Sequence, residues 1–242
     1  MKSVHQFSFY FKTDRLLKDF ESIINSWNKH ANTGYYEGEW SGIALREPVN
    51  KIHPLSTIGP EESIYKNTPL LDELPYFQEV LNYFECEKTS VRLLRLTPGS
   101  KIKEHTDLDL SFFHGNVRLH VPILTHEKIQ FKIDGQDISM KPGECWFAEF
   151  CKPHSVSNSG ETDRIHLVID LKVNDWLRDL FENEGIIEVG EKAPDPIDSY
   201  SLNDKLNMIK SLRLLGSETS DNLAQELIKK YNIPTQKIED DY

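Results

Sequence analysis

Residues 88–171 form a succession of short apolar runs separated by turns, and this alternation limits the chain to a few fold classes. The runs are rich in Val, Ile, Leu and Phe, and turn sequences such as Asp134-Gly135 and Lys141-Pro142-Gly143-Glu144 separate them. We expect strands near residues 89–97, 117–123, 128–134, 136–140, 145–150, 154–158 and 164–171. Many short strands at this spacing are typical of antiparallel sandwiches and barrels. The sequence therefore predicts a mainly β core of jelly-roll type, the double-stranded β-helix of cupin-like proteins.

Helical patterns flank this core on both sides. Before it we expect a strand at 6–12, a helix at 14–27 with Asp14 as N-cap, a strand within 38–47, a long loop at 48–68 and a helix at 70–84. After it we expect helices at 174–183, 202–215 and 220–231. We therefore divide the chain into a β domain with N-terminal helices, residues 1–172, and a small C-terminal helical region, residues 173–242.

Charge and composition exclude several classes of partner. The chain has 28 Lys and Arg against 39 Asp and Glu, a net charge of −11, and contains no basic run, so we expect no nucleic-acid partner. No apolar run reaches the roughly 18 residues that a membrane helix needs, and residues 1–12 lack the features of a signal peptide. Cys86, Cys145 and Cys151 form no CxxC pair and are expected to be free thiols. These features favour a cytoplasmic protein without a membrane partner.

Two of the expected strands carry arginine and histidine on a single face. Arg118 and His120 share one face of their strand, and Arg164 and His166 share one face of another, while the opposite faces are apolar. Such residues can simply face solvent. If Arg164 points inward, however, it predicts an anionic ligand, because its fork matches a carboxylate and an unpaired buried guanidinium is costly. The alternative for Arg164 is a salt bridge with a neighbouring acidic residue such as Asp163.

A candidate metal site is formed by His105 and Asp107 together with His154. A His-x-Asp triplet supplies two ligands from one short segment, because alternate residues of a strand share a face. Two imidazoles and a carboxylate hold ferrous ion on one side and leave the other side open. The triplet alone occurs readily by chance. His154, which follows His105 by 49 residues across several expected strands, and Arg164, ten residues later, make the set more specific.

As a set, these segments resemble the aspartyl/asparaginyl β-hydroxylase family of Fe(II)/2-oxoglutarate-dependent dioxygenases. The resemblance covers roughly residues 88–171 and is carried by Arg92-Leu93-Leu94-Arg95-Leu96-Thr97-Pro98-Gly99, His105-Thr106-Asp107, Arg118-Leu119-His120-Val121-Pro122-Ile123, residues 140–146, His154-Ser155-Val156-Ser157-Asn158 and Arg164-Ile165-His166-Leu167-Val168-Ile169-Asp170. It implies that His105, Asp107 and His154 bind Fe(II). It also implies that Arg164 binds the far carboxylate of 2-oxoglutarate, with Arg118 and His120 as further cosubstrate contacts.

The resemblance further implies a reaction and a class of substrate. Dioxygen and 2-oxoglutarate would be consumed, succinate released and an unactivated C–H bond hydroxylated. The layout, with a short N-terminal segment and a helical C-terminal extension, resembles that of bacterial family members and favours a free amino acid or a small amino-acid derivative as substrate. Arg95 and Trp40 are candidate substrate contacts, the 48–68 loop is a candidate lid, and a homodimer is possible.

Two other functions stay open at this point. A hydroxylase of Asp, Asn or Pro residues in a partner polypeptide would use the same iron site, with the C-terminal helices as a docking surface. A non-catalytic cupin-type module that binds a metabolite would share the fold. The second is disfavoured because cupins usually place a His-x-His pair in their first metal motif, and this chain contains no His-x-His.

Overall fold

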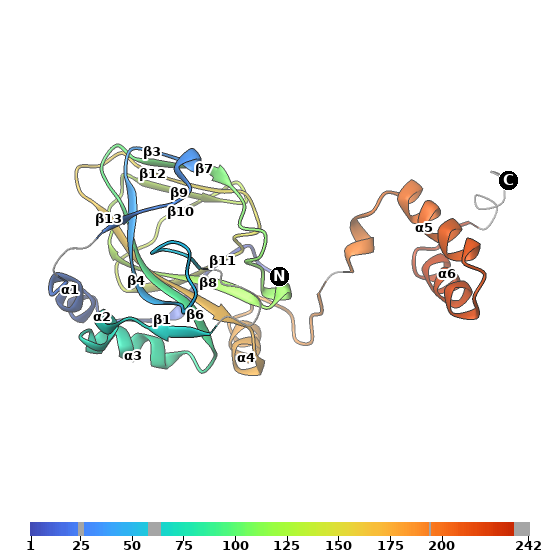
Figure 1. Ribbon diagram of the computed structural model, residues 1–242, viewed down its shortest axis with the longest axis horizontal. Coiled ribbons are helices and arrows are strands. Elements are labelled where there is room, and N and C mark those ends of the chain that lie inside the picture. Colours follow the sequence, from blue (N-terminus) through green and yellow to red (C-terminus); the bar gives the residue numbers. More distant parts are fainter. Residues whose placement is uncertain (24–26, 58–63, 194, 235–242) are drawn as a thin grey trace. The chain divides into compact units, whose positions relative to one another are not determined.

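The core of the protein consists of two antiparallel sheets that face each other (Figure 1). The computed structural model describes residues 1–23, 27–57, 64–193 and 195–234. The larger sheet has the strand order β1 (Val4–Tyr10), β11 (Glu144–Ala148), β8 (Asn116–Leu124), β13 (Arg164–Lys172), β6 (Lys88–Leu96), β4 (Trp40–Pro48) and β2 (Asn28–Lys29), with β5 (Tyr65–Asn67) paired to β4. The smaller sheet has the order β10 (Gln136–Ile138), β9 (Ile129–Ile133), β12 (His154–Asn158), β7 (Lys101–His105) and β3 (Tyr36–Glu37). The predicted double-stranded β-helix fold is confirmed.

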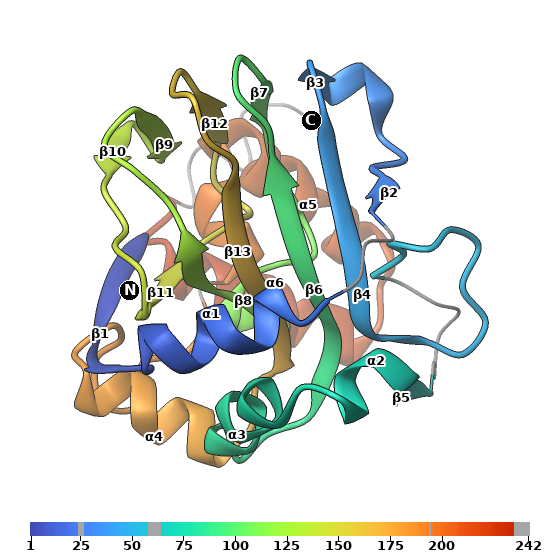
Figure 2. The ribbon, with the colours of Figure 1, turned by 90° about the vertical axis from the view of Figure 1, so that its left-hand side faces the viewer.

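Alternating side chains of the larger sheet divide the interior into two parts. One face packs against the helices α1 (Thr13–Glu21), α2 (Pro69–Asp72), α3 (Pro75–Tyr83) and α4 (Asp175–Asn183), which lie on the side away from the smaller sheet (Figures 1 and 2). The buried Leu119, Leu167 and Ile169 belong to this layer. The opposite face looks toward the smaller sheet, where Leu94, Phe131 and other apolar residues form a second core. The arginine- and histidine-bearing faces of β8 and β13 therefore point into the space between the sheets.

Several element boundaries differ from those expected. The helix expected at 70–84 is divided into α2 and α3, because Pro75 disfavours a helical conformation at Leu74 and starts a new helix. The expected cap Asp14 lies in the first turn of α1, whose N-cap position is Lys12. Strand β7 was not expected, because its sequence Lys-Ile-Lys-Glu-His has a single apolar residue. The short 3₁₀ segments are η1 (Thr33–Tyr35), η2 (Phe112–His114) and η3 (Pro196–Ser199).

The chain divides into two compact units between Glu191 and Lys192, whereas the sequence analysis placed the boundary after Lys172. The difference arises at α4, which Asn174 caps through a hydrogen bond from the backbone N–H of Leu177. Leu177 and Phe181 of this helix are fully buried in the helix-side core of the first unit. The second unit contains α5 (Leu202–Leu214) and α6 (Glu218–Lys230), which pack around Ile209, Ala224, Ile228 and Ile233. Among the described helices, none is long and apolar enough to cross a membrane.

Candidate active site

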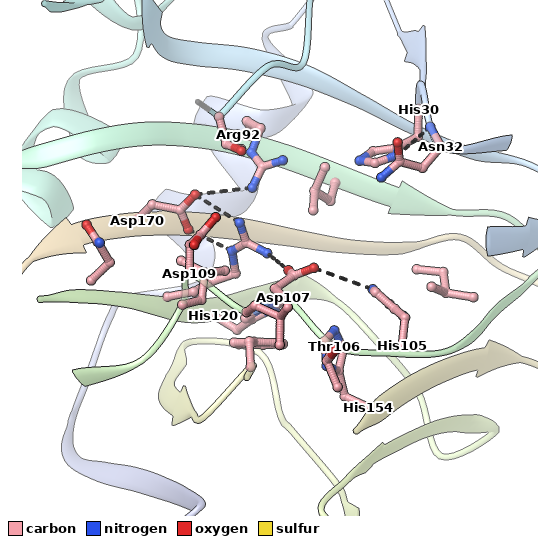
Figure 3. Close-up of a pocket in the computed structure, with 18 of the residues that line it drawn as sticks. His30, Asn32, Arg92, His105, Thr106, Asp107, Asp109, His120, His154 and Asp170 are labelled. Atoms are coloured by element: carbon pink, nitrogen blue, oxygen red, sulfur yellow. Dashed lines mark hydrogen bonds and ion pairs between the residues drawn. The ribbon is translucent and has the colours of Figure 1, made fainter. Parts of the chain in front are cut away.

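The three expected metal ligands lie together at one end of the space between the sheets (Figure 3). His105 ends β7 and His154 begins β12, and these two residues are direct partners across the antiparallel pair. Their ring centroids are 4.1 Å apart. Asp107 follows His105 by two residues, and its backbone N–H donates to the carbonyl of Phe150 at 2.9 Å. One ligand atom from each of the three side chains lies within 4.8 Å of the others.

Hydrogen bonds to the backbone orient both histidines. His105 Nδ1 lies 2.8 Å from the carbonyl oxygen of Lys103, and His154 Nδ1 lies 3.0 Å from that of Lys152. A carbonyl oxygen only accepts, so both Nδ1 atoms carry the proton and both Nε2 atoms present a lone pair. Burial lowers the pKa of His154 to about 4, which keeps the ring neutral near pH 7. The two imidazoles are thus set to ligate a metal through Nε2, in the manner of metal-binding histidines fixed by an outer hydrogen bond.

Asp107 is held by an arginine. Arg118 Nη1 donates to Asp107 Oδ2 at 2.7 Å, while the other oxygen, Oδ1, lies 3.9 Å from His105 Nε2. Burial raises the pKa of Asp107, but the positive charge of Arg118 and the nearby His154 and His105 outweigh that effect and lower the pKa overall. The carboxylate is therefore ionised, with one oxygen engaged by Arg118.

The other donors of Arg118 go to Asp170. Arg118 Nε donates to Asp170 Oδ1 at 2.7 Å and Nη2 donates to Asp170 Oδ2 at 3.0 Å, as expected for residues directly opposite each other on β8 and β13. Arg92 Nη2 approaches the same Oδ2 at 3.4 Å. Arg118 was expected to contact 2-oxoglutarate. The structure instead directs its guanidinium to two carboxylates of the chain, so we interpret it as a support for Asp107.

Arg164 has the environment of an anion-binding residue. Its side chain is 2% exposed, and no carboxylate of the described residues lies within ion-pair distance. Burial lowers the pKa of Arg164 to about 9, and its Nε lacks a hydrogen-bond partner among these residues. The salt bridge with Asp163 considered above does not form, since Asp163 lies beside Arg95 instead, at 3.9 Å. A buried guanidinium in this state leaves room for a ligand carboxylate.

Two histidines accompany Arg164. Nδ1 of His166 lies 3.0 Å from Arg164 Nη2 and 3.2 Å from His120 Nδ1. Because a guanidinium only donates, His166 Nδ1 is an acceptor and His120 Nδ1 donates to it, which leaves Nε2 of His120 as a free acceptor in this state. Burial lowers the pKa values of both histidines well below their usual value, with the positive charge of Arg164 acting in the same direction. Within the described chain, neither Nε2 has a hydrogen-bond partner.

The groups described above, except His166, line one cavity of about 910 Å³. His105, Asp107 and His154 lie along it together with Arg118, His120 and Arg164, the six expected metal and cosubstrate residues. Trp40, an expected substrate contact, also lines it; its ring is 9% exposed and stacks on His30 at 3.5 Å between centroids. The volume is near the upper end of the range of about 300–1,000 Å³ found for small-molecule sites. Such a cavity has room for a cosubstrate and a small substrate together.

Arg95 is not part of this cavity. It lies on the face of β6 opposite to Arg92, where it bonds to Glu39 and Ser41 and stacks on Trp27 at 4.5 Å. The expectation that Arg95 contacts substrate is therefore not supported by its position. The 48–68 loop contributes Thr57 and Tyr65 to the cavity, whereas residues 58–63, which belong to the expected lid, lie outside the described residues.

Three residues of the site were not predicted from the sequence. Arg92 and Asp170 are buried, line the cavity and are ion-paired, and His30 lies on Trp40. A signal for Asp170 was present, since it continues the alternate series that begins with Arg164 and His166. Arg92 likewise lies on the cavity face of β6 together with Leu94, which alternation alone could have shown once that face was known to point inward. For His30 the sequence carried no comparable signal.

Comparison with known proteins gives a family and several distant relatives. The family model described as aspartyl/asparaginyl beta-hydroxylase matches residues 13–173, more than half of the chain. L-proline cis-4-hydroxylase of Rhizobium meliloti (strain 1021) is 25% identical over 178 residues, covering 72% of this chain and 62% of that protein. The chain thus spans less than two thirds of the length of this relative.

Solved structures of similar shape include two oxygenases. A 2OG-Fe(II) oxygenase family oxidoreductase from Burkholderia pseudomallei has a TM-score of 0.49 and 11% identity, over 71% of this chain and 86% of that one. A prolyl-4-hydroxylase from Pseudomonas putida has a TM-score of 0.42 and 14% identity, over 71% and 93%. These resemblances are too distant to carry an argument. The family model, by contrast, spans every residue that the structure gathers around the cavity, and the chain belongs to the aspartyl/asparaginyl beta-hydroxylase family.

Proposed function

We propose that the protein is a Fe(II)- and 2-oxoglutarate-dependent dioxygenase that hydroxylates an unactivated C–H bond of a free amino acid or a small amino-acid derivative. The observation that carries the proposal is the pairing of two sites in one cavity. One is the cluster of His105, Asp107 and His154. The other is Arg164, a buried guanidinium for which the described chain provides no anion. Family membership supports the same reading.

The residues present fit a ferrous ion. Two imidazoles with Nδ1 on a backbone carbonyl present Nε2, and Asp107 offers the carboxylate oxygen that Arg118 leaves free, which is the two-histidine, one-carboxylate set of non-haem iron oxygenases. When bound, the iron with 2-oxoglutarate and dioxygen supplies the oxidising chemistry, and 2-oxoglutarate is decarboxylated to succinate. The protein holds the ligands in place and keeps Asp107 ionised.

In this proposal Arg164 binds the cosubstrate. Its guanidinium would bind the far carboxylate of 2-oxoglutarate, which supplies the charge partner that it lacks. His120 adjoins this position as a neutral, buried ring, and Phe131 lies beneath the guanidinium at 6.0 Å. The surrounding apolar side chains exclude water from that end of the cavity, which strengthens the charge-assisted contact.

In this proposal the substrate binds on the side of the cavity that Arg92 lines. Arg92 is 3% exposed, and among the described residues its one polar side-chain contact is the 3.4 Å approach to Asp170, while its Nε lacks a partner. We infer that the substrate presents a carboxylate to Arg92 and packs its carbon skeleton near Trp40 and His30. The name of the Rhizobium relative favours a proline-like ring as a first trial substrate.

The test begins with anaerobic titration of the protein with Fe(II) and 2-oxoglutarate, followed through the weak visible absorption of the chelate. Wild type is expected to show the band, His154→Ala to lose it, and Arg164→Ala to need more 2-oxoglutarate. No band in the folded wild type with metal present would contradict the proposal and favour a metabolite-binding module of the same fold.

The substrate class is tested by succinate release under air. Free amino acids, beginning with L-proline, are compared with short peptides that contain Pro, Asp or Asn. Succinate released only with free amino acids supports the proposal. Coupling only to peptides would leave the oxygenase chemistry in place and shift the substrate to a polypeptide.

A further inference from the structure

Four charged residues, two of them buried and two half-buried, form a continuous chain that begins at the metal cluster and ends at the substrate side of the cavity. Asp107 accepts from Arg118, Arg118 donates two further bonds to Asp170, and Asp170 also faces Arg92 (Figure 3). Asp170 is 4% exposed and Arg92 is 3% exposed. Two guanidinium groups and two carboxylates alternate along this chain, so its formal charge is zero.

Arg118 contacts the two carboxylates in different ways. Arg118 uses three nitrogen atoms on two carboxylates, with distances of 2.7, 2.7 and 3.0 Å. Two of these three bonds go to Asp170, which occupies the directly opposite position on the neighbouring strand. Only Nη1 reaches Asp107, and it contacts Oδ2 rather than Oδ1. The direction in which Arg118 reaches Asp107 is therefore set by Asp170.

Without the Asp170 carboxylate, Arg118 would lose its two-point anchor. The guanidinium would then be free to rotate about its long side chain, and Arg92 would repel it from the side that Asp170 had occupied. Asp107 lies after the end of β7 and is fixed through its backbone N–H, so its side-chain rotamer depends on Arg118. The consequence would reach the metal cluster although Asp170 itself is not among the clustered ligands.

We propose that Asp170 is a positioning residue for the metal site, which acts through Arg118 to hold the Asp107 carboxylate in the orientation that ligates the ion. This inference rests on the proposed function, in which Asp107 is an iron ligand. Outer contacts of this kind change metal affinity by about 10- to 100-fold when they are removed from other metalloproteins. We expect a loss of that size here.

The experiment measures metal affinity of the full-length protein, freed of metal, by titration with Co(II) under its visible spectrum and with Fe(II) under anaerobic conditions. Wild type is compared with Asp170→Asn, Asp107→Ala and the double variant. Asp170→Asn is expected to weaken Co(II) binding by about 10- to 100-fold. In the Asp107→Ala background, Asp170→Asn should cause no further loss, because the residue through which it acts is gone.

Asp163→Asn is the matched control. It removes a carboxylate that neighbours Arg95 outside the cavity, at 3.9 Å, and it should leave Co(II) affinity unchanged. If Asp170→Asn fails to fold, Asp170→Glu replaces it in the same comparison with Asp107→Ala and the double variant. That variant keeps the charge but displaces the carboxylate, so a positioning role predicts weakened binding, whereas a role in charge balance alone predicts wild-type affinity.

The possible outcomes distinguish the role of Asp170 from the existence of the metal site. Equal affinity of wild type and both Asp170 variants would overturn the role of Asp170 and leave the metal site standing. Additive losses in the double variant would also overturn it, because they would show that Asp170 acts independently of Asp107. Failure of the wild type to bind Co(II) or Fe(II) would overturn both the inference and the proposed function.

Discussion

Arg164 shows how a single residue can favour function over stability. Its guanidinium is buried, its pKa is lowered to about 9 by burial, and the described chain offers it no carboxylate. An unpaired buried charge costs folding free energy, and a hydrophobic residue of similar length is often neutral or stabilising in its place.

Arg164→Met should therefore change stability and ligand binding in opposite directions. We expect its free energy of unfolding, measured by urea titration of the metal-free protein, to equal or exceed that of wild type. We expect its affinity for 2-oxoglutarate, measured by anaerobic titration with Fe(II) present, to fall at least tenfold, as for loss of a charge-assisted contact. A strong loss of stability would show that the contact of Arg164 with His166 stabilises the fold more than burial of the charge destabilises it.

Two buried histidines and one half-buried histidine make stability depend on pH. Burial lowers the pKa of His30 to about 3, with Arg92 and Arg118 acting in the same direction, and burial holds the pKa values of His120 and His166 well below 6.5. In the unfolded chain these rings take up protons near pH 6.5, whereas in the folded protein they do not. The unfolded state thus binds more protons below pH 6.5, so stability falls as the pH falls.

We expect the metal-free protein to lose about 1.4 kcal/mol of stability per pH unit for each such histidine, progressively from about pH 6.5 downward. Thermal unfolding followed by circular dichroism between pH 7.5 and 5 tests this slope. His30→Gln should flatten the curve, while the exposed His114→Gln should not. Equal slopes in wild type and His30→Gln would contradict the assignment of His30 as a ring that stays neutral in the folded protein.

At the scale of single residues, the sequence predicted part of the cavity lining. His105, Asp107, His154, Arg164, His120 and Trp40 all line the cavity. Arg95 was placed wrongly, because alternation tells which residues share a face but not which face points inward. The partners of Arg118 could not be predicted either, since cross-strand register with Asp170 depends on how β8 and β13 pair.

Among the elements, the close contact between β4 and β6 depends on a glycine. A Cβ atom on Gly42 would lie 2.8 Å from the carbonyl oxygen of Leu93 and 2.9 Å from Leu94 Cδ2. The first of these neighbours is backbone and cannot move without shifting the strand. Trp40 begins the same strand and lines the cavity, so a shift of β4 would disturb the site as well.

Gly42→Ala is expected to lower the free energy of unfolding by about 1–3 kcal/mol, the usual cost of overpacking. Gly34→Ala is the matched control, because a Cβ there would meet no atom within 4 Å. Urea unfolding of the two variants and wild type makes the comparison. If both variants match wild type, β4 and β6 are less tightly constrained than the structure indicates.

Strands with many apolar residues were predicted from the sequence, whereas a strand with few apolar residues was missed. Strand β13 begins at Arg164 as expected and ends one residue later than expected, because Ile, Leu and Val occupy most of its positions. Strand β7 has too few apolar residues to be recognised, although it carries His105; pairing with β12 and β3, not composition, makes it a strand. The division of α2 from α3 at Pro75 was visible in principle, but the helical spacing of apolar residues concealed it.

For the whole molecule, the cavity and the C-terminal helices belong to different compact units. All residues that line the cavity precede Val173, whereas α5 and α6 have their own small core. The sequence could not place the boundary between units, because the apolar residues of α4 look alike whether they pack on the β core or on α5. The expected homodimer and compartment stay predictions.

A chain ending after Glu191 should fold and bind Fe(II) and 2-oxoglutarate with the affinity of the full protein, since every described lining residue is retained. Thermal unfolding and anaerobic titration of the shortened and complete chains give the comparison. Loss of ligand binding in a folded, shortened chain would assign residues after 191 a part in the active site. Loss of succinate release alone would assign them a part in substrate handling.

The ion pair between Arg118 and Asp107 affects how the protein can take up a metal after it has folded. Because the Asp107 carboxylate has a counter-ion within the chain, its negative charge is compensated without a bound cation. Under the proposed function, folding of the chain and uptake of Fe(II) would then be separate steps, and a protein that has lost its metal would keep the carboxylate ready to bind it again.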